Sequence, residues 1–342
     1  MRRRELLHYL ARRVATLVPV LLGILLLVFL MVRAIPGSPA RNMLGQRATA
    51  EEIAKVEAQL GLNEPVFIQF FKFSAQAVQG DFGKSLRHHV PVTEELHRAI
   101  PATIELTVTA FLIAFPLGVV LGGWSALKKG SFADLATTAL SLSGISVPIF
   151  WLGLLLILTF SVGLEVLPFG GRSEALIPPW SGFKLVDALV GGPPGSFWDA
   201  LKHLILPALT LSTVPLAIIA RMSRSCALSV LDSDYVRTAR AKGLPEHRVL
   251  WKHVLPNAIL PVITVAGLQF GYLLGGAVLT EHVFSWPGMG SLLLRAISER
   301  DYPVIQGSVL VAAVAFALVN LAVDLLYAIL DPRVNLEGQA GS

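Results

Sequence analysis

Residues 102–126 read ATIELTVTAFLIAFPLGVVLGGWSA, a mostly apolar stretch that decides the fold class. A helix of about 20 residues crosses the roughly 30 Å of hydrocarbon in a bilayer. Five more apolar blocks lie at 14–32, 133–161, 204–220, 258–280 and 304–330. The sequence therefore predicts an all-α integral membrane protein with about six transmembrane helices.

The composition of the chain agrees with this prediction. Hydrophobic residues make up 54% of the sequence and charged residues only 15%, with a mean hydropathy of +0.65. A soluble chain of 342 residues would need a more charged exterior. A β-barrel is disfavoured because the apolar blocks do not alternate apolar and polar residues.

The distribution of Lys and Arg predicts the orientation. Basic residues are about twice as dense in segments 1–13, 127–133, 221–256 and 331–342 as in the segments that alternate with them. The positive-inside rule places these four segments, and hence both termini, in the cytoplasm. The first block exceeds the apolar core of a signal peptide, so we expect it to be retained as a helix.

The first outer segment, 34–101, is long enough to contain helices of its own. Thr49 and Glu52 form a capping-box pattern, and Gly61 stands where that helix should end. A second amphipathic stretch begins at Pro65 and closes at Gly80. We expect a small helical cap on the outer face, whereas the outer segment 162–203 predicts no definite element.

The inner segment 221–256 is the most informative region. It contains DSDYVRTARAKG at 232–243, followed by LPEHRVLWKHVLPN at 244–257. Asp232 or Ser233 can cap a helix, Gly243 can end it, and Pro245 can open another at its first position. A plain orienting loop needs no such pair of capped helices, so a docking surface for a partner is the favoured interpretation.

This segment resembles a known motif. In membrane subunits of binding-protein-dependent ABC importers the pattern is Glu-Ala-Ala-x3-Gly-x9-Ile-x-Leu-Pro, and Ala239, Gly243, Leu255 and Pro256 match it, whereas Arg237, Thr238 and His253 depart from it. These departures are similar to the version in the dipeptide/oligopeptide/nickel branch. Further stretches point to the same family: GDFGKS at 80–85, PATIEL at 101–106, VPIF at 147–150, FSWPGMG at 284–290, RDYP at 300–303 and DPR at 331–333.

The resemblance implies a type I ABC importer permease fold in which the cytoplasmic helices couple the chain to an ATPase. The residues carried over to that docking segment are Tyr235, Arg237, Ala239, Arg240, Ala241, Lys242, Gly243, Leu244, Pro245, His253, Leu255, Pro256 and Asn257. It also implies a second, homologous permease, one or two ATPase subunits that bind ATP and Mg, and an extracytoplasmic solute-binding protein. The expected substrates are di- or oligopeptides, with nickel chelates, glutathione-like peptides and other small solutes left open.

The resemblance divides the chain into four parts. Residues 1–33 would hold the cytoplasmic N-terminus and first helix, 34–101 the outer loop, 102–333 the transmembrane core and 334–342 a cytoplasmic tail.

The chain itself is not expected to bind ATP or to catalyse a reaction. Gly83-Lys84-Ser85 imitates the end of a Walker A loop, but Val78 stands where its first glycine belongs. His88 and His89 would need further ligands to hold a metal, so no metal site is predicted. Nothing in the sequence indicates nucleic-acid binding, and Cys226 is the single cysteine.

Small and polar residues within the blocks suggest packing and pathway positions. Gly267, Gly271 and Gly275 recur every four residues, as do Gly118 and Gly122. Both sets favour close helix packing, within the chain or against the partner permease, over the alternative of a pore-lining role. Substrate-pathway candidates are Gln269 and Asn320. Asp324 lies one turn after Asn320, where a structural ion pair near the inner boundary is the favoured interpretation.

Three other classes of membrane protein have requirements of their own. A secondary, ion-coupled transporter needs no ATPase and remains the alternative, although the docking segment argues against it. A membrane-embedded enzyme needs a cluster of catalytic or metal-ligating groups, and a channel needs a filter or charge ring. Neither pattern is found.

Overall fold

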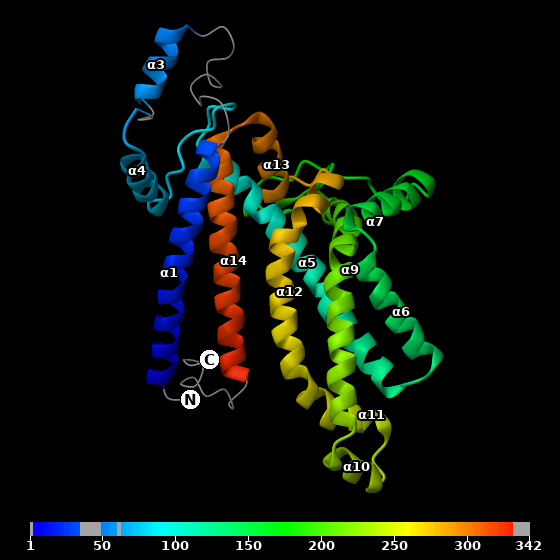
Figure 1. Ribbon diagram of the computed structural model, residues 1–342. Helices are drawn as coiled ribbons and strands as arrows, with labels where there is room; N and C mark the ends of the chain where they lie inside the picture. Colours follow the sequence, from blue (N-terminus) through cyan, green and yellow to red (C-terminus); the bar gives the residue numbers. More distant parts are fainter. Residues whose placement is uncertain (1–2, 35–48, 60–62, 331–342) are drawn as a thin grey trace.

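A computed structural model describes residues 3–34, 49–59 and 63–330 (Figure 1). These residues form helices joined by loops, and the described part contains no strand apart from an isolated bridge between Lys84 and Pro91. The helices, in chain order, are α1 (Arg3–Ala34), α3 (Ala50–Gln59), α4 (Val66–Val78), α5 (Val92–Leu127), α6 (Phe132–Ser146), α7 (Ile149–Leu156), the π-helix η1 (Ile157–Gly163), α8 (Lys184–Gly191), α9 (Ser196–Leu231), α10 (Asp234–Ala241), α11 (Glu246–Val249), the π-helix η2 (Leu250–Val254), α12 (Leu255–Val283), α13 (Met289–Glu299) and α14 (Tyr302–Leu330).

The prediction of an all-α membrane protein is confirmed. Four helical segments are long and apolar enough to cross a membrane, at Val92–Leu127, Ser196–Leu231, Glu246–Gly275 and Tyr302–Val323. The bent pair of α6 with α7 and η1 makes up to a fifth, whereas the apolar part of α1, Ala15–Met31, is shorter than these spans, so the predicted first span stays a prediction. The fourth predicted span, at 204–220, is much shorter than the observed helix α9 (Ser196–Leu231), which continues unbroken through Pro207 and Pro215.

The third predicted span is wrong as a single straight helix. The structure bends by 105° between Ser146 and Ile149, so that α7 and η1 leave the direction of α6. Val147 is extended (φ −80°, ψ 125°) and precedes Pro148, which caps α7. Proline disfavours helical backbone in the residue before it, and this explains the break.

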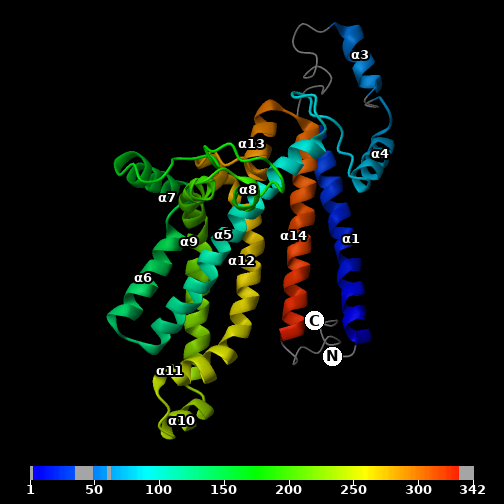
Figure 2. The same cartoon turned by 180° about the vertical axis from the view of Figure 1, so that it is seen from behind.

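The core of the bundle lies where α5, α9 and α12 meet. α5 and α9 pack side by side along most of their length, α12 packs on α9 and α14, and α1 packs on α14 (Figures 1 and 2). The central cluster is formed mainly by alanine and leucine from these three helices together with Trp286. Small side chains let the helix backbones approach closely, as is typical of membrane bundles.

The bundle has two distinct ends, called here the α10 end and the α13 end. α10 and α11 lie at the first, and α1 begins and α14 ends toward the same side (Figure 1). α3, α4 and α13 lie at the other end, together with the loop that contains α8.

The predicted helical cap is present at the α13 end. Glu52 accepts a hydrogen bond from the Thr49 N–H (2.9 Å), and the Glu52 N–H donates to Thr49 Oγ1 (3.3 Å), which is the expected capping box. Pro65 precedes α4, and Gly80 (φ +77°) follows it. The predicted end at Gly61 lies outside the described residues. The structure adds α8 and α13, which were not predicted.

Candidate functional site

The segment between α9 and α12 forms a helix–turn–helix at the α10 end. Ser233 precedes α10, and Pro245 precedes α11, one position earlier than the predicted first helical residue. Gly243 adopts φ +76°, and its N–H donates to the Arg240 carbonyl (2.9 Å). A Cβ on Gly243 would meet no atom within 4 Å, so glycine is needed here for backbone conformation, not for space.

One face of the helix–turn–helix is fixed to the bundle. Val236, Val249 and Val254 are completely buried and pack with the ends of α5 and α9 in one apolar cluster. This packing joins the helix–turn–helix to the transmembrane helices α5 and α9.

The opposite face is exposed and basic. Tyr235 is 46% exposed and Trp251 66%, and the side chain of Arg237 is 70% exposed. Exposed aromatic and Arg side chains are typical of binding hot spots. Of the predicted docking residues, nine lie on the surface: Tyr235, Arg237, Arg240, Ala241, Lys242, Gly243, Pro245, Pro256 and Asn257.

The other four predicted residues are less exposed. Ala239 is buried, and Leu244, His253 and Leu255 are half-buried. The sequence patterns did not single out the role of Glu246, which pairs with Arg240 across the turn through two contacts of 2.8 and 3.1 Å. This ion pair joins α10 to α11.

A second ion pair at the same end joins three spans. Arg224 on α9 donates from Nε and Nη2 to the two carboxylate oxygens of Asp134 on α6, at 2.6 and 2.9 Å. Ser125 at the end of α5 and the N–H of Gly130 also donate to Asp134. We call these four residues the α5–α6–α9 clamp. A long-range pair of this kind leaves no local pattern in the sequence.

The α13 end is held by buried carboxylates. Glu281 at the end of α12 is completely buried and accepts hydrogen bonds from Thr103 Oγ1 (2.6 Å) and from the N–H groups of Gly290 (2.7 Å) and Ser291 (3.0 Å). The two N–H groups belong to the first turn of α13, where a carboxylate is favoured. The stretches 101–106 and 284–290, noted above for their resemblance, therefore meet in space.

A similar contact joins two other stretches noted for that resemblance. Asp301 accepts hydrogen bonds from Ser85 Oγ and from the N–H of Leu86 (3.2 Å), which ties the loop after α4 to the start of α14. The Ser85 hydroxyl of the Walker-like tripeptide is thus engaged in a structural contact.

A buried ion pair holds the loop 162–203 onto α5. Arg172 donates from Nη2 to Glu105 and to the carbonyl of Gly182 (3.0 Å), and its guanidinium lies 5.5 Å from the ring centroid of Trp286. The side chains of Arg172 and Glu105 are 9% and 6% exposed. A buried charge of either sign would be unfavourable without this partner.

The packing glycines fall into two groups. A Cβ on Gly122 would lie 2.3 Å from the Ala220 carbonyl oxygen, and one on Gly118 would lie 2.8 Å from Ile219, both on α9. Gly267 and Gly271 face Val323 and Phe316 of α14 in the same way. A Cβ on Gly275 meets no atom within 4 Å among the described residues, so packing within the described part of the chain gives no reason for a glycine there.

The two pathway candidates lie on different helices. The Oε1 atom of Gln269 on α12 is buried and has no hydrogen-bond partner among the described residues. Asn320 on α14 lies against Gly271, with its Oδ1 atom 3.3 Å from the place of a Cβ there. The side chain of Asp324 lies outside the described residues.

His88 and His89 are not brought together with other metal ligands. His88 Nδ1 contacts Glu95 (2.8 Å), whereas His89 has a left-handed backbone (φ 58°). The part of the chain that the structure describes contains no group of three or more His, Cys, Asp or Glu able to hold a metal.

Comparison with known proteins gives consistent matches. The family described as "Binding-protein-dependent transport system inner membrane component" matches residues 118–336, and its N-terminal counterpart matches residues 6–107. The di/tripeptide transport system permease of Pseudomonas aeruginosa is 48% identical over 96% of this chain and 99% of its own length. The dipeptide permease of Escherichia coli is 45% identical (96% and 99%), and the glutathione permease of Salmonella paratyphi A is 41% identical (96% and 99%).

The fold has a counterpart among solved structures. A chain of the inward-facing methionine ABC transporter superposes with a TM-score of 0.51, covering 70% of this chain and 97% of that chain at 17% identity. This similarity shows a shared fold.

Proposed function

This chain belongs to the family of binding-protein-dependent transport system inner membrane components, and from that premise we propose how it couples ATP hydrolysis to uptake. The chain is a multi-pass permease subunit of the inner membrane. With a homologous permease it would form an alternating-access pathway. Hydrolysis of ATP would take place on partner ATPase subunits, and an extracytoplasmic binding protein would deliver the solute.

The observation that carries this proposal is the two-sided helix–turn–helix. Its exposed face presents Tyr235, Arg237 and Trp251, and its buried face packs on α5 and α9. Docking of an ATPase on the exposed face would let ATP favour one arrangement of the spans over the other. A partner can shift such an equilibrium only by its difference in affinity for the two states.

The α5–α6–α9 clamp gives the second step of the transmission. Arg224 lies on α9, the same helix that leads into α10, and its contact with Asp134 carries the motion to α6. Apolar packing and the clamp would together move the three spans as one body.

Short peptides are the proposed substrates. The relatives compared above transport di- and tripeptides, dipeptides and glutathione, and all of these are small peptides. The proposed orientation puts both termini and the α10 end in the cytoplasm, and residues 34–101 outside the cell. The four-part division at 1–33, 34–101, 102–333 and 334–342 is part of the same proposal.

Purification of the tagged chain from native membranes in mild detergent tests the docking site. Gly243→Val should lose the ATPase, because valine is strongly disfavoured at φ +76°. Gly80→Val is the matched control, since Gly80 has φ +77° and equally open surroundings at the opposite end of the bundle. Retention of the ATPase by the Gly243 variant, or its loss from both variants, would refute the docking assignment.

Uptake by the purified complex separates the importer from the secondary transporter. In proteoliposomes, uptake of a labelled dipeptide should require ATP on the ATPase side and should survive dissipation of ion gradients. Uptake that follows the ion gradient without ATP would favour the secondary transporter instead.

A further inference from the structure

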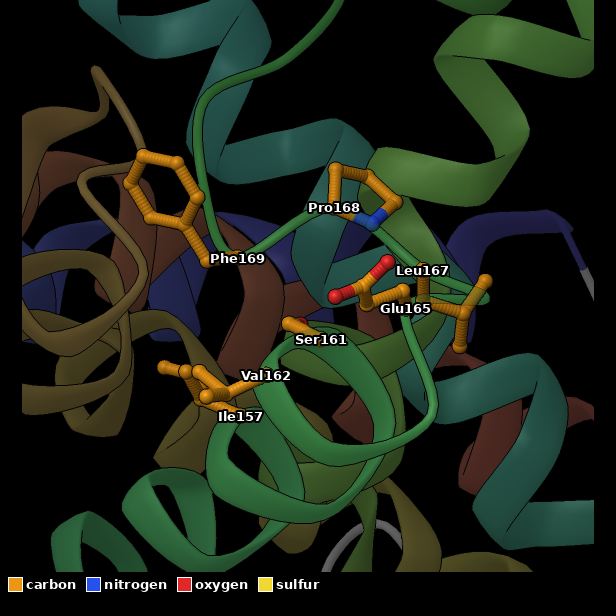
Figure 3. A pocket seen from close by; sticks show the side chains of 7 residues that line it. All are labelled: Ile157, Ser161, Val162, Glu165, Leu167, Pro168 and Phe169. Carbon is orange, nitrogen blue, oxygen red and sulfur yellow. The ribbon is translucent and has the colours of Figure 1, made fainter.

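A pocket of about 410 Å³ opens at the end of η1, beside the loop that follows it (Figure 3). It is lined by Ile157, Ser161, Val162, Glu165, Leu167, Pro168 and Phe169. Five of the seven side chains are apolar, and none is basic. The pocket lies toward the α13 end, which is the outer end in the proposed orientation, and it belongs to none of the contacts described above.

Glu165 supplies the single charge of the pocket. Its carboxylate points into the space between Ser161, Pro168 and Phe169 (Figure 3). Glu165 is exposed, and no hydrogen bond or ion pair engages its side chain within the described part of the chain. The carboxylate is therefore free to receive a cationic group.

Ser161 supplies an unused hydroxyl. A helical serine commonly donates to the carbonyl four residues earlier, as Ser146 does here (2.9 Å). The Oγ atom of Ser161 is buried and has no such partner among the described residues. An unpaired buried hydroxyl is unfavourable, and a ligand with hydrogen-bonding groups would satisfy it.

The backbone around the pocket is unusual in two respects. Glu165 has φ +52°, a conformation that is unfavourable for a residue with a side chain, and η1 is a π-helix. Both features occur preferentially at functional sites. Here the strained conformation coincides with the residue that carries the charge of the pocket.

We propose that this pocket binds the α-ammonium group of a short peptide at Glu165, with the first side chain of the peptide against the apolar wall. The inference rests on the proposed function and adds a subsite to it. A carboxylate matches an ammonium group in charge, and the Ser161 hydroxyl, once its side chain turns toward the pocket, can accept a second hydrogen bond from it. One carboxylate and one hydroxyl are too few ligands for a divalent cation.

Direct binding to the assembled transporter tests the subsite. The complex, in nanodiscs without the binding protein, is titrated with radiolabelled Ala-Phe and with N-acetyl-Ala-Phe, which lacks the ammonium group. The wild type should bind Ala-Phe about fivefold more tightly than N-acetyl-Ala-Phe. This factor is the upper range for a solvent-accessible ion pair. Glu165→Gln should abolish this preference.

Two further variants keep the test interpretable. Glu165→Gly removes the carboxylate but fits the left-handed backbone, so it should lose the preference as Glu165→Gln does. Glu174→Gln is the matched control, because Glu174 is an exposed glutamate of the same loop that does not line the pocket, and it should keep the preference. Equal affinity of the wild type and Glu165→Gln for Ala-Phe would overturn the proposal.

Two other occupants give distinct results. If the difference between wild type and variant needs phosphatidylethanolamine in the nanodisc, the occupant is a lipid ammonium group and the proposal is wrong. If Glu165→Gln releases the second permease from the complex, the pocket belongs to a subunit contact and the proposal is again wrong. ATP-driven uptake by the same purified complex in proteoliposomes reports separately on the proposed function.

Discussion

Replacing Arg224 by glutamine removes the cation from the α5–α6–α9 clamp. The side chain of Asp134 is 9% exposed and that of Arg224 is 31% exposed. Without Arg224, the Asp134 carboxylate retains only the hydrogen bonds from Ser125 and from the N–H of Gly130. The variant thus leaves a nearly buried charge without its counterion.

The size of the effect follows from the two hydrogen bonds of the pair. A hydrogen bond to a charged group contributes about 1.5–3 kcal/mol, and the partial exposure of Arg224 reduces the total. We expect an interaction energy of about 2 kcal/mol between Arg224 and Asp134, larger than for a surface pair. If this whole interaction energy were present in one transport state and absent from the other, the population ratio of the two states would change by at most about 30-fold.

A double-mutant cycle measures this energy. The stability of the detergent-purified complex is determined for the wild type, Arg224→Gln, Asp134→Asn and the double variant. Peptide imported per ATP hydrolysed is then measured for each in proteoliposomes. Arg224→Gln should lower both stability and import per ATP, and the double variant should be less damaged than the sum of the single variants.

An exposed ion pair on α5 provides the control. Arg98 and Glu94 are an i,i+4 pair with side chains 78% and 47% exposed, so their interaction energy should stay below about 0.5 kcal/mol. Strictly additive effects at Arg224 and Asp134, or unchanged import per ATP in all clamp variants, would refute the reasoning.

Three further predictions concern packing and buried charge. Glu281→Leu should destabilise the complex by about 3 kcal/mol or more in a thermal unfolding assay, because three donors, two of them in buried hydrogen bonds, lose their acceptor. Gly122→Ala should destabilise the complex by about 1–3 kcal/mol, because the new Cβ would overlap with α9. A Cβ on Gly123 has no described atom within 4 Å, so Gly123→Ala should be neutral or up to about 1 kcal/mol stabilising in the same assay. Burial opposes ionisation of Asp187, but hydrogen bonds from Ser181 lower its pKa below 3.8. The stability that Asp187 contributes to its loop should be present above about pH 3.8 and lost as the pH falls through the lower folded pKa. Pepsin cleavage of the loop should show this acid dependence in the wild type and lose it in Asp187→Asn.

The sequence predicts best what local rules determine. The apolar blocks predict the spans, the Thr49–Glu52 pattern predicts a helix start, and Gly243 predicts a turn, because each depends on residues within one or two helical turns. Pro207 and Pro215 show the opposite case. They obscure the limits of α9, because the neighbouring helices that make an unbroken helix favourable are distant in sequence.

The candidate site was predictable to the same extent. The exposed residues of the helix–turn–helix follow from the motif, but the Arg240–Glu246 pair and the Glu105–Arg172 pair depend on chain segments meeting in three dimensions. The bend at Pro148 falls between these cases. The X-Pro rule gives a local reason for it, yet the apolar run across it concealed the break.

The close helix packing at Gly122 and the long-range ion pair of Arg224 depend on each other. The atoms nearest to a Cβ on Gly122 include the Arg224 backbone N, at 2.9 Å. The absence of a side chain at Gly122 therefore sets how closely α9 approaches α5 at the level of the clamp. Any larger residue would push α9 outward and draw Arg224 away from Asp134, which lies on α6. Substitution at Gly122 should accordingly lower import per ATP as Arg224→Gln does, and the two effects should be less than additive because both act on one contact.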